Sequence, residues 1–238
     1  MTTDLFDGCA PSQAADHVVC SRGGLRRLSG KARRRRKTRI TSQTFKIPCK
    51  VKGCKLSLTF PVEAKLKDGS PVQLVLADQQ DVEPLRSLYR IIVEVGTSYP
   101  HDRFPNEDDF MDYWFLGKST VAAYVPDRAR AAGMAGAFYL KPNWPGQARQ
   151  VANAGFIVAP DWRNKGLGWL LGATMLTYAK QLGYRSVIFN HVFSENVAAR
   201  HLWDKLGFKE LGVIPGAVRK NDRAYQDALI MFRSLLER

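Results

Sequence analysis

The stretch that decides the fold reads Val158-Ala159-Pro160-Asp161-Trp162-Arg163-Asn164-Lys165-Gly166-Leu167-Gly168 and joins an apolar strand pattern to a helix pattern. Two glycines let a backbone approach an anion closely, and the first N–H groups of a helix have no partner within the helix. Arg163 and Lys165 add positive charge. The third glycine of the dinucleotide fingerprint is missing, as is the Gly-Lys-Ser/Thr ending of the P-loop. The stretch therefore predicts a site for another phosphate-bearing cofactor; the alternative is a plain strand–loop–helix connection with a glycine for packing.

Strand and helix patterns alternate on both sides of this stretch. Residues 60–67 and 72–77 read as a hairpin around Asp68-Gly69, because Asp-Gly favours a tight turn. Further strands are expected at 120–125, 135–140, 151–158, 186–193, 208–214 and 224–232. Asp81, Asn106 and Asn196 can cap helices, and another helix is expected from Leu167 to Leu182. This order predicts a single α/β domain over residues 58–238.

Positive charge is concentrated at the start of the chain. The formal net charge is +14, and residues 1–44 hold 10 Lys/Arg against 3 Asp/Glu. Much of this charge lies in the run Lys31-Ala32-Arg33-Arg34-Arg35-Arg36-Lys37-Thr38-Arg39, which repels itself and rarely packs. We expect residues 1–44 to form a disordered basic tail. A nuclear-import signal and a nucleic-acid contact are the alternatives for this run.

The four cysteines, Cys9, Cys20, Cys49 and Cys54, all lie in the first quarter of the chain. This excludes a cysteine nucleophile and a thiolate metal site from the rest of the chain, and no metal is expected. No stretch of 18 apolar residues exists, and the first 20 residues lack the apolar core of a secretory signal. We expect reduced thiols and a cytoplasmic protein, with entry into the nucleus if the run at 31–39 is an import signal.

The central stretch and the segments after it resemble the GNAT superfamily of acetyl-CoA-dependent N-acetyltransferases. The resemblance rests on Val158-x-Pro160-x-x-Arg163-x-x-Gly166-x-Gly168, a helix, a strand, and Asn196 before a helix that ends at Leu206-Gly207-Phe208. It implies one domain with a mixed, mostly antiparallel central sheet flanked by helices. It also implies that the loop holds the pyrophosphate of acetyl-CoA and that two parallel strands splay apart to admit the cofactor.

A closer resemblance is to the fungal azetidine-2-carboxylate acetyltransferases, which confer resistance to proline analogues. It spans roughly residues 58–232. The segments that carry it are Thr97-Ser98-Tyr99-Pro100, Tyr113-Trp114-Phe115, Ala137-Phe138-Tyr139-Leu140-Lys141-Pro142-Asn143, Asn153-Ala154-Gly155-Phe156, Ile188-Phe189-Asn190-His191-Val192-Phe193, Asn196, Trp203-Asp204-Lys205-Leu206 and Gly212-x-Ile214-Pro215.

This resemblance implies a role for each candidate residue. Asn153 would recognise the acceptor, and the backbone N–H groups of Asn190 and His191 would hold its carboxylate. Asn196 would lie by the sulfur of acetyl-CoA and ease the departure of the thiolate. The remaining contacts to the cofactor would come from Phe156, Val158, Arg163, Asn164, Lys165, Gly166, Leu167 and Gly168.

Each asparagine also has an ordinary structural interpretation. Asn196 could be a plain helix cap, Asn153 a buried amide bonded to backbone, and Asn190 a strand-end residue. Two groups that many GNAT enzymes use are missing. The helix expected after Asn196 has no tyrosine to protonate the thiol, and residues 151–158 contain no carboxylate to act as a base. Water would then take the proton of the amine.

The sequence leaves three functions open. The first is acetylation of a small amino or imino acid, such as azetidine-2-carboxylate or a proline-related metabolite, by direct attack of the amine on the thioester. The second is a protein acetyltransferase acting on lysine or an N-terminus, which would need an open groove with acidic residues. The third is a nucleic-acid-binding protein with a vestigial GNAT domain, in which the basic tail contacts the nucleic acid. The resemblance is also compatible with a homodimer, and nothing indicates a membrane partner.

Overall fold

The computed structural model describes residues 58–126, 128–221 and 223–236. The predicted basic tail at 1–44, the run at 31–39 and all four cysteines lie outside the described residues. No helix in the described part of the chain is both long enough and apolar enough to cross a bilayer.

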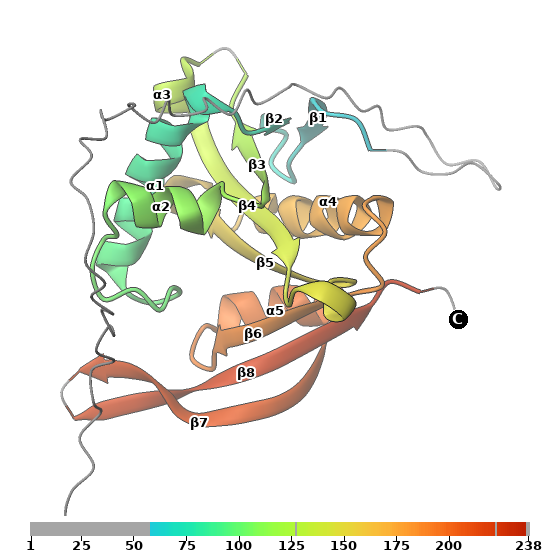
Figure 1. The fold of residues 1–238 in the computed structure, drawn as a ribbon. Coiled ribbons are helices and arrows are strands. Elements are labelled where there is room, and N and C mark those ends of the chain that lie inside the picture. The colour runs from blue at the N-terminus through green and yellow to red at the C-terminus, as the bar shows by residue number, and fades with distance from the viewer. Residues whose placement is uncertain (1–57, 127, 222, 237–238) are drawn as a thin grey trace, which may run out of the picture. The chain divides into compact units, whose positions relative to one another are not determined.

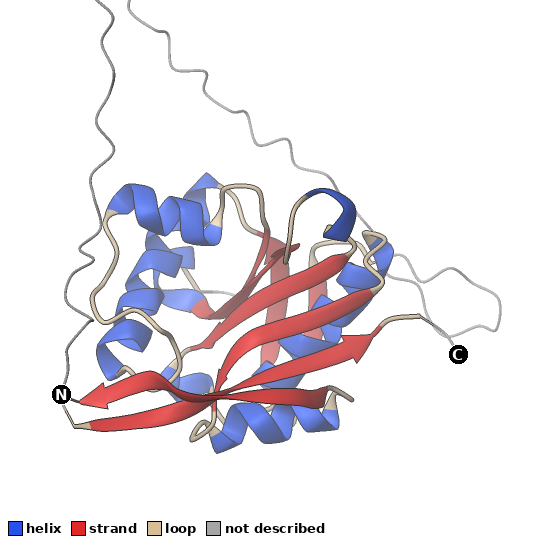
Figure 2. Cartoon of the chain, turned by 60° about the horizontal axis from the view of Figure 1, so that its bottom comes forward, coloured by secondary structure: helices blue, strands red, loops and turns tan. Residues whose placement is uncertain are grey.

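Eight strands form one mixed sheet in the order β1-β2-β3-β4-β5-β6-β8-β7 (Figures 1 and 2). All neighbouring strands are antiparallel except β5 and β6, which run parallel. The mixed, mostly antiparallel sheet that the resemblance implied is therefore confirmed. The strands are β1 (Val62–Lys65), β2 (Pro71–Leu76), β3 (Ser119–Tyr124), β4 (Met134–Pro142), β5 (Val151–Val158), β6 (Ser186–Phe193), β7 (Lys209–Asn221) and β8 (Ala224–Ser234).

Helices cover both faces of the sheet (Figure 1). Alternate residues of β4 and β5 face opposite sides, and each side has its own apolar cluster. One cluster is formed with α1 and α2, and the other with α4 and α5. The helices are α1 (Val82–Val95), α2 (Glu107–Trp114), α3 (Arg130–Gly133), α4 (Leu167–Gln181) and α5 (Val197–Lys205), with short 3-10 turns at Gln79–Asp81, Gly146–Ala148 and Pro160–Trp162.

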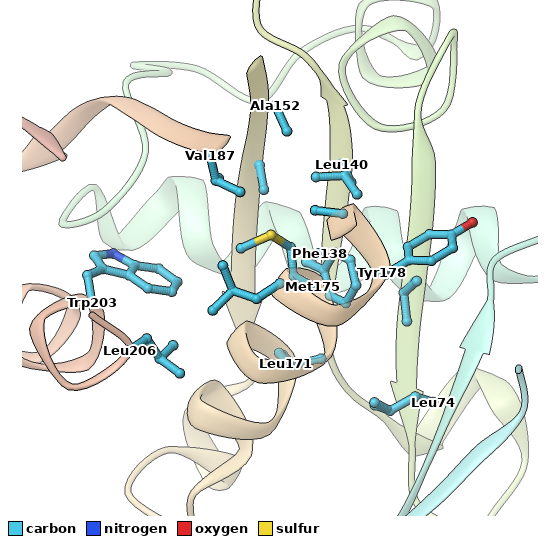
Figure 3. Packing of buried hydrophobic residues seen from close by; sticks show 14 of the residues in the cluster. Leu74, Phe138, Leu140, Ala152, Leu171, Met175, Tyr178, Val187, Trp203 and Leu206 are labelled. Carbon is cyan, nitrogen blue, oxygen red and sulfur yellow. The ribbon is translucent and has the colours of Figure 1, made fainter. Parts of the chain in front are cut away.

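The larger cluster fixes α4 against the middle of the sheet. Leu171 and Met175 of α4 are fully buried and point toward Phe138 of β4 (Figure 3). Burying one such side chain contributes about 1.5–3 kcal/mol. Because α4 begins directly after the 163–168 loop, this packing also fixes where the loop lies.

Two details differ from the sequence-based expectations. Asp81 makes no side-chain cap on α1; its carboxylate is fully buried and accepts hydrogen bonds from Tyr124 (2.6 Å) and Arg130 (2.9 Å). The strand expected to end at Ile214 continues to Asn221. Pro215 is tolerated because β7 is the edge strand, where a missing N–H breaks no ladder, and the register shifts between Ile214 and Val218.

Candidate active site

An opening lies between β5 and β6 in the middle of the sheet. The two strands pair only at Val151–Ser186 and Ala152–Val187, and the pairing ends there although both strands continue for six more residues. Beyond Ala152 their backbones therefore share no ladder. This is the splaying of two parallel strands that the resemblance implied.

The 163–168 loop leads from β5 into α4 with two residues in the left-handed region. Asn164 has φ 62° and Gly166 has φ 93°. Gly166 precedes the first residue of α4, and the first N–H groups of that helix point into the loop without intrahelical partners. Asn164 and Gly166 thus form the turn that exposes these donors, and exposed Arg163 adds positive charge beside them.

The hairpin of β1 and β2 holds this loop from the side. The Lys67 N–H donates to the Lys165 carbonyl oxygen at 3.2 Å. The Lys165 ammonium lies 4.0 Å from the Asp68 carboxylate and 4.8 Å from the Trp162 ring centroid. Hydrogen bonds from Ser70 and, to a smaller degree, the charge of Lys165 lower the pKa of Asp68. The carboxylate stays ionised and attracts the Lys165 ammonium toward the hairpin.

Gly168, at the end of the loop, and Gly172, one turn further along α4, allow close packing of α5. A Cβ on Gly168 would lie 3.3 Å from a methyl carbon of Leu202, and a Cβ on Gly172 would collide with Leu206. Both glycines therefore bring α5 close to α4. The two interpretations of the loop, a phosphate-binding turn and a connection with a glycine for packing, are compatible. Gly166 provides the left-handed backbone conformation of the turn, and Gly168 leaves room for Leu202.

The face of the sheet toward α1 and α2 carries amide side chains at the opening. Asn153 lies on this face by strand alternation, and its Nδ2 donates to the Ile188 carbonyl oxygen of β6 at 3.0 Å. Asn190 of β6 donates to Asn143 Oδ1 at 2.6 Å. The structure thus brings Asn153 and Asn190 to the same side of the opening.

A bulge in β6 places Asn190 and His191 outside regular pairing. The register with β8 passes from Phe189–Met231 to Val192–Leu229 and gives the two intervening residues no partner in β8. The His191 ring lies 5.6 Å from the Phe193 ring, and partial burial lowers its pKa, so the imidazole is neutral near pH 7. A bulge of this kind redirects backbone groups away from the ladder.

Tyrosines cover the wall beside the opening. The Tyr99 hydroxyl donates to the Phe156 carbonyl oxygen of β5 at 3.1 Å. The Tyr139 ring lies directly over Gly155, where a Cβ would approach it within 2.5 Å, and its hydroxyl is 3.4 Å from that of Tyr113. Burial, and to a smaller degree neighbouring tyrosines, raise the pKa of Tyr99 and Tyr113. These hydroxyls remain protonated, so they can donate hydrogen bonds but cannot act as bases near pH 7.

Asn196 lies at the end of β6 nearest to α5. Its Oδ1 accepts from the Ala199 N–H at 3.1 Å and caps α5, which confirms the expected cap. This bond uses the oxygen, and the Nδ2 donors of Asn196 are not needed for the cap. The cap and a contact to the cofactor are therefore compatible.

A surface pocket of about 550 Å³ opens beside Asn196. Lys220 in its wall is paired with Glu195 at 2.7 Å, so Arg219 leaves the wall with a net positive charge. The residues that line it are Val95, Gly96, Thr97, Glu195, Asn196, Val197, Ala198, Arg219, Lys220 and Gln226. Two of these residues lie close in sequence to the opening: Thr97 is two residues from Tyr99, which contacts β5, and Asn196 follows the end of β6.

Sequence reasoning assigned no role to Tyr99, Tyr139 or Asn143. Each belongs to a segment that carries the closer resemblance, but no spacing along the chain relates them to Asn153 or Asn190. Only the fold brings them to one face. No group of three His, Cys, Asp or Glu residues among the described residues could hold a metal ion.

The sequence matches the "Acetyltransferase (GNAT) family" over residues 85–208. It is 35% identical over 151 residues to the N-acetyltransferase aca1 of Schizosaccharomyces pombe, covering 58% of this chain and 72% of that protein. The solved structure of an N-acetyltransferase from Kribbella flavida is 29% identical, with a TM-score of 0.62, covering 68% of this chain and 97% of that chain. The fold is shared with the phosphinothricin acetyltransferase of Sinorhizobium meliloti, solved in complex with acetyl-CoA, which is 23% identical with a TM-score of 0.60 and covers 68% of this chain and 88% of that one. The chain belongs to the GNAT family and is an acetyl-CoA-dependent N-acetyltransferase.

Proposed function

We propose that the enzyme acetylates a small amino or imino acid, of which azetidine-2-carboxylate and proline-related compounds are the candidates. The observation that carries this proposal is the pair of amide side chains, Asn153 and Asn190, beside the bulge at 190–191. An amide recognises an amine or a carboxylate without the desolvation cost of a buried charge. The bulge adds backbone donors suited to a carboxylate.

In this proposal the cofactor enters the opening between β5 and β6. The 163–168 loop and the start of α4 hold the diphosphate, with Arg163, Asn164, Lys165, Gly166, Leu167 and Gly168 as the contacting residues. The backbone at Phe156 and Val158 would meet the pantetheine arm, since β5 has no ladder on that side. The bond from Tyr99 to the Phe156 carbonyl oxygen orients this part of β5 before the cofactor arrives.

The reaction needs a neutral amine and a positioned thioester. The amine nitrogen attacks the acetyl carbonyl carbon, an oxyanion forms, the C–S bond breaks and the thiolate of coenzyme A leaves. Holding the two reactants in line supplies much of the acceleration. Backbone N–H groups near Phe156 and Val158 would stabilise the oxyanion, and Asn196 Nδ2 would donate to the departing sulfur. The amine proton passes to water, since β5 has no carboxylate and the nearby tyrosines stay protonated.

The pocket charge supports an acceptor that carries a carboxylate over a lysine side chain. The charges of Lys220 and Glu195 offset each other, so the charge of Arg219 makes the pocket wall positive overall. Such a wall attracts a carboxylate and repels an ammonium group. A basic peptide would need the opposite sign.

A turnover assay tests the proposal. The purified chain is incubated with acetyl-CoA and, separately, azetidine-2-carboxylate, proline analogues and a lysine-containing peptide, and released thiol and the acetylated product are measured. We expect turnover of an imino acid and a much lower rate with azetidine-2-carboxamide, which lacks the carboxylate. Turnover of the peptide alone would instead establish a protein acetyltransferase.

Location in the cell is a separate proposal. The run at 31–39 would carry a share of the cytoplasmic enzyme into the nucleus. A fluorescent fusion with these basic residues replaced by Gln should then be excluded from the nucleus, and an unchanged distribution would contradict the proposal.

A further inference from the structure

Asn143 is tied to the candidate acceptor site although it lies on no element of that site. It follows β4 directly, and its N–H donates to the Val151 carbonyl oxygen at 2.8 Å, which fixes its backbone. Its Oδ1 accepts from Asn190 Nδ2 at 2.6 Å, across 47 positions of sequence. The loop between β4 and β5 therefore contacts β6 at the bulge.

The other end of the Asn143 amide has no hydrogen-bond partner within the described part of the chain. Its Nδ2 is buried and makes no hydrogen bond to any described residue. A buried amide donor without a partner costs free energy, so the fold gains nothing from this N–H group. An apolar residue would avoid the cost, which indicates that the bond at Oδ1 has a purpose of its own.

That bond acts on the segment whose backbone leaves the ladder. Asn190 and His191 have no register partner in β8, and pairing with β5 has ended at Val187. The segment therefore depends on side chains for its conformation. Asn190 is held by Asn143, and the His191 ring lies against Phe193.

We propose that Asn143 is a positioning residue for the acceptor: its Oδ1 holds Asn190, and with it the bulge whose N–H groups bind the acceptor carboxylate. The inference rests on the proposed function, since it assumes that the bulge meets a carboxylate. Asn143 acts through Asn190 and does not take part in the reaction itself.

Kinetics of Asn143→Ala and Asn190→Ala, alone and combined, test the role. Loss of one oriented hydrogen bond should raise the KM for azetidine-2-carboxylate about tenfold in Asn143→Ala. The kcat and the KM for acetyl-CoA should stay within about twofold, because the cofactor loop is untouched. The double variant should show the KM of Asn190→Ala alone, because Asn143 would have nothing left to hold.

Three controls separate positioning from folding. Asn106→Ala removes a different asparagine side chain, which accepts from the Asp109 N–H at the start of α2, and should leave all three kinetic constants unchanged. Asn143→Ser, a residue favoured in turns, replaces Asn143→Ala if the latter does not fold, and its hydroxyl is too short to reach Asn190. The KM for azetidine-2-carboxamide should change little in Asn143→Ala, because the bulge then has no carboxylate to hold.

The outcomes distinguish this role from the proposed function. Wild-type turnover of azetidine-2-carboxylate with an unchanged KM in Asn143→Ala, or additive effects in the double variant, would overturn the positioning role and leave the proposed function standing. No wild-type turnover of any amino or imino acid would overturn both.

Discussion

The proposed cofactor loop at 163–168 and the proposed acceptor face differ in the kind of chemical group that each presents. At 163–168 the groups proposed to bind the cofactor are backbone N–H groups. The turn that exposes them contains two left-handed residues, and the first hairpin bonds to it at Lys165. On the acceptor face they are side-chain amides and hydroxyls, and Asn153, Asn190 and Tyr99 each bond to another part of the protein. The loop needs glycines at particular positions, and these can be recognised in the sequence. The acceptor face depends instead on which strands become neighbours in the sheet.

The difference shows how each region can change. A loop that binds through its backbone N–H groups tolerates many side chains but needs its glycines. Side-chain amides that bond to one another need every partner in the set. Variants in the loop should therefore change the KM for acetyl-CoA, and variants on the acceptor face the KM for the acceptor. The substitutions that test this difference follow, from the largest expected effect to the smallest.

Gly136→Ala should give the largest effect by disturbing the sheet beneath the cofactor loop. A Cβ at this position of β4 would lie 2.7 Å from the Ile157 carbonyl oxygen, and the backbone of β5 cannot move aside without breaking the ladder. We expect a loss of about 1–3 kcal/mol in the free energy of unfolding, measured by urea denaturation. Gly212→Ala is the control, since a Cβ there meets nothing within 4 Å. Equal stability of the two variants would contradict the prediction.

Arg163→Ala and Asn153→Ala should each raise a different Michaelis constant. Removing a charged partner of a phosphate should raise the KM for acetyl-CoA about tenfold or more in Arg163→Ala, with the KM for the acceptor unchanged. Asn153→Ala should show the reverse pattern. Lys209→Ala, an exposed cation on the edge strand β7, serves as the charge control. If both variants raised the same constant, the division of the site would be wrong.

Asn196 can be changed so that its cap and its proposed contact to sulfur are separated. Asn196→Asp keeps an oxygen for the Ala199 N–H but removes the Nδ2 donor, so kcat should fall while stability is kept. Asn196→Ala should lower kcat and also cost about 1 kcal/mol of stability through the lost cap. Thermal unfolding and steady-state rates measure both. Full activity in Asn196→Asp would leave Asn196 as a cap alone.

His101 should give the smallest effect, seen only in mild acid. Burial lowers the pKa of His101, partly opposed by Asp102 and Asp109, and its Nδ1 lies 2.7 Å from the Tyr89 hydroxyl. Because the folded pKa is lower than the unfolded value of about 6.5, the unfolded chain binds more protons, and stability falls as the pH drops below about 6.5. The free energy of unfolding, measured by urea denaturation at several pH values from about 7.5 to about 5, should depend less on pH in His101→Gln than in the wild type. A wild-type dependence on pH in His101→Gln would contradict this prediction.

The local parts of the fold could be predicted from the sequence and the long-range parts could not. β5, β6 and the cap at Asn196 lie where the patterns placed them, because alternation and capping depend on residues close in sequence. Asp81 was misassigned because its partner Tyr124 lies 43 positions away. The end of β7 was misjudged because Pro215 stops a central strand, and only the topology shows that this strand is at the edge.

The candidate site divides in the same way. Gly166 and Arg163 could be recognised from spacing alone, whereas the second purpose of Gly168 required knowing that Leu202 lies against it. The contact between Asn143 and Asn190 and the position of Tyr139 over Gly155 depend on strand order, which one sequence does not determine.

The bond from Lys67 to Lys165 has a consequence for how the enzyme can be shortened. The family match begins at residue 85, yet the first hairpin, at 62–76, grips the loop that would receive the diphosphate. A fragment that starts at residue 85 would keep every motif and lose this grip. We therefore expect a catalytically competent fragment to need the hairpin at 62–76, upstream of the residues by which the family is recognised.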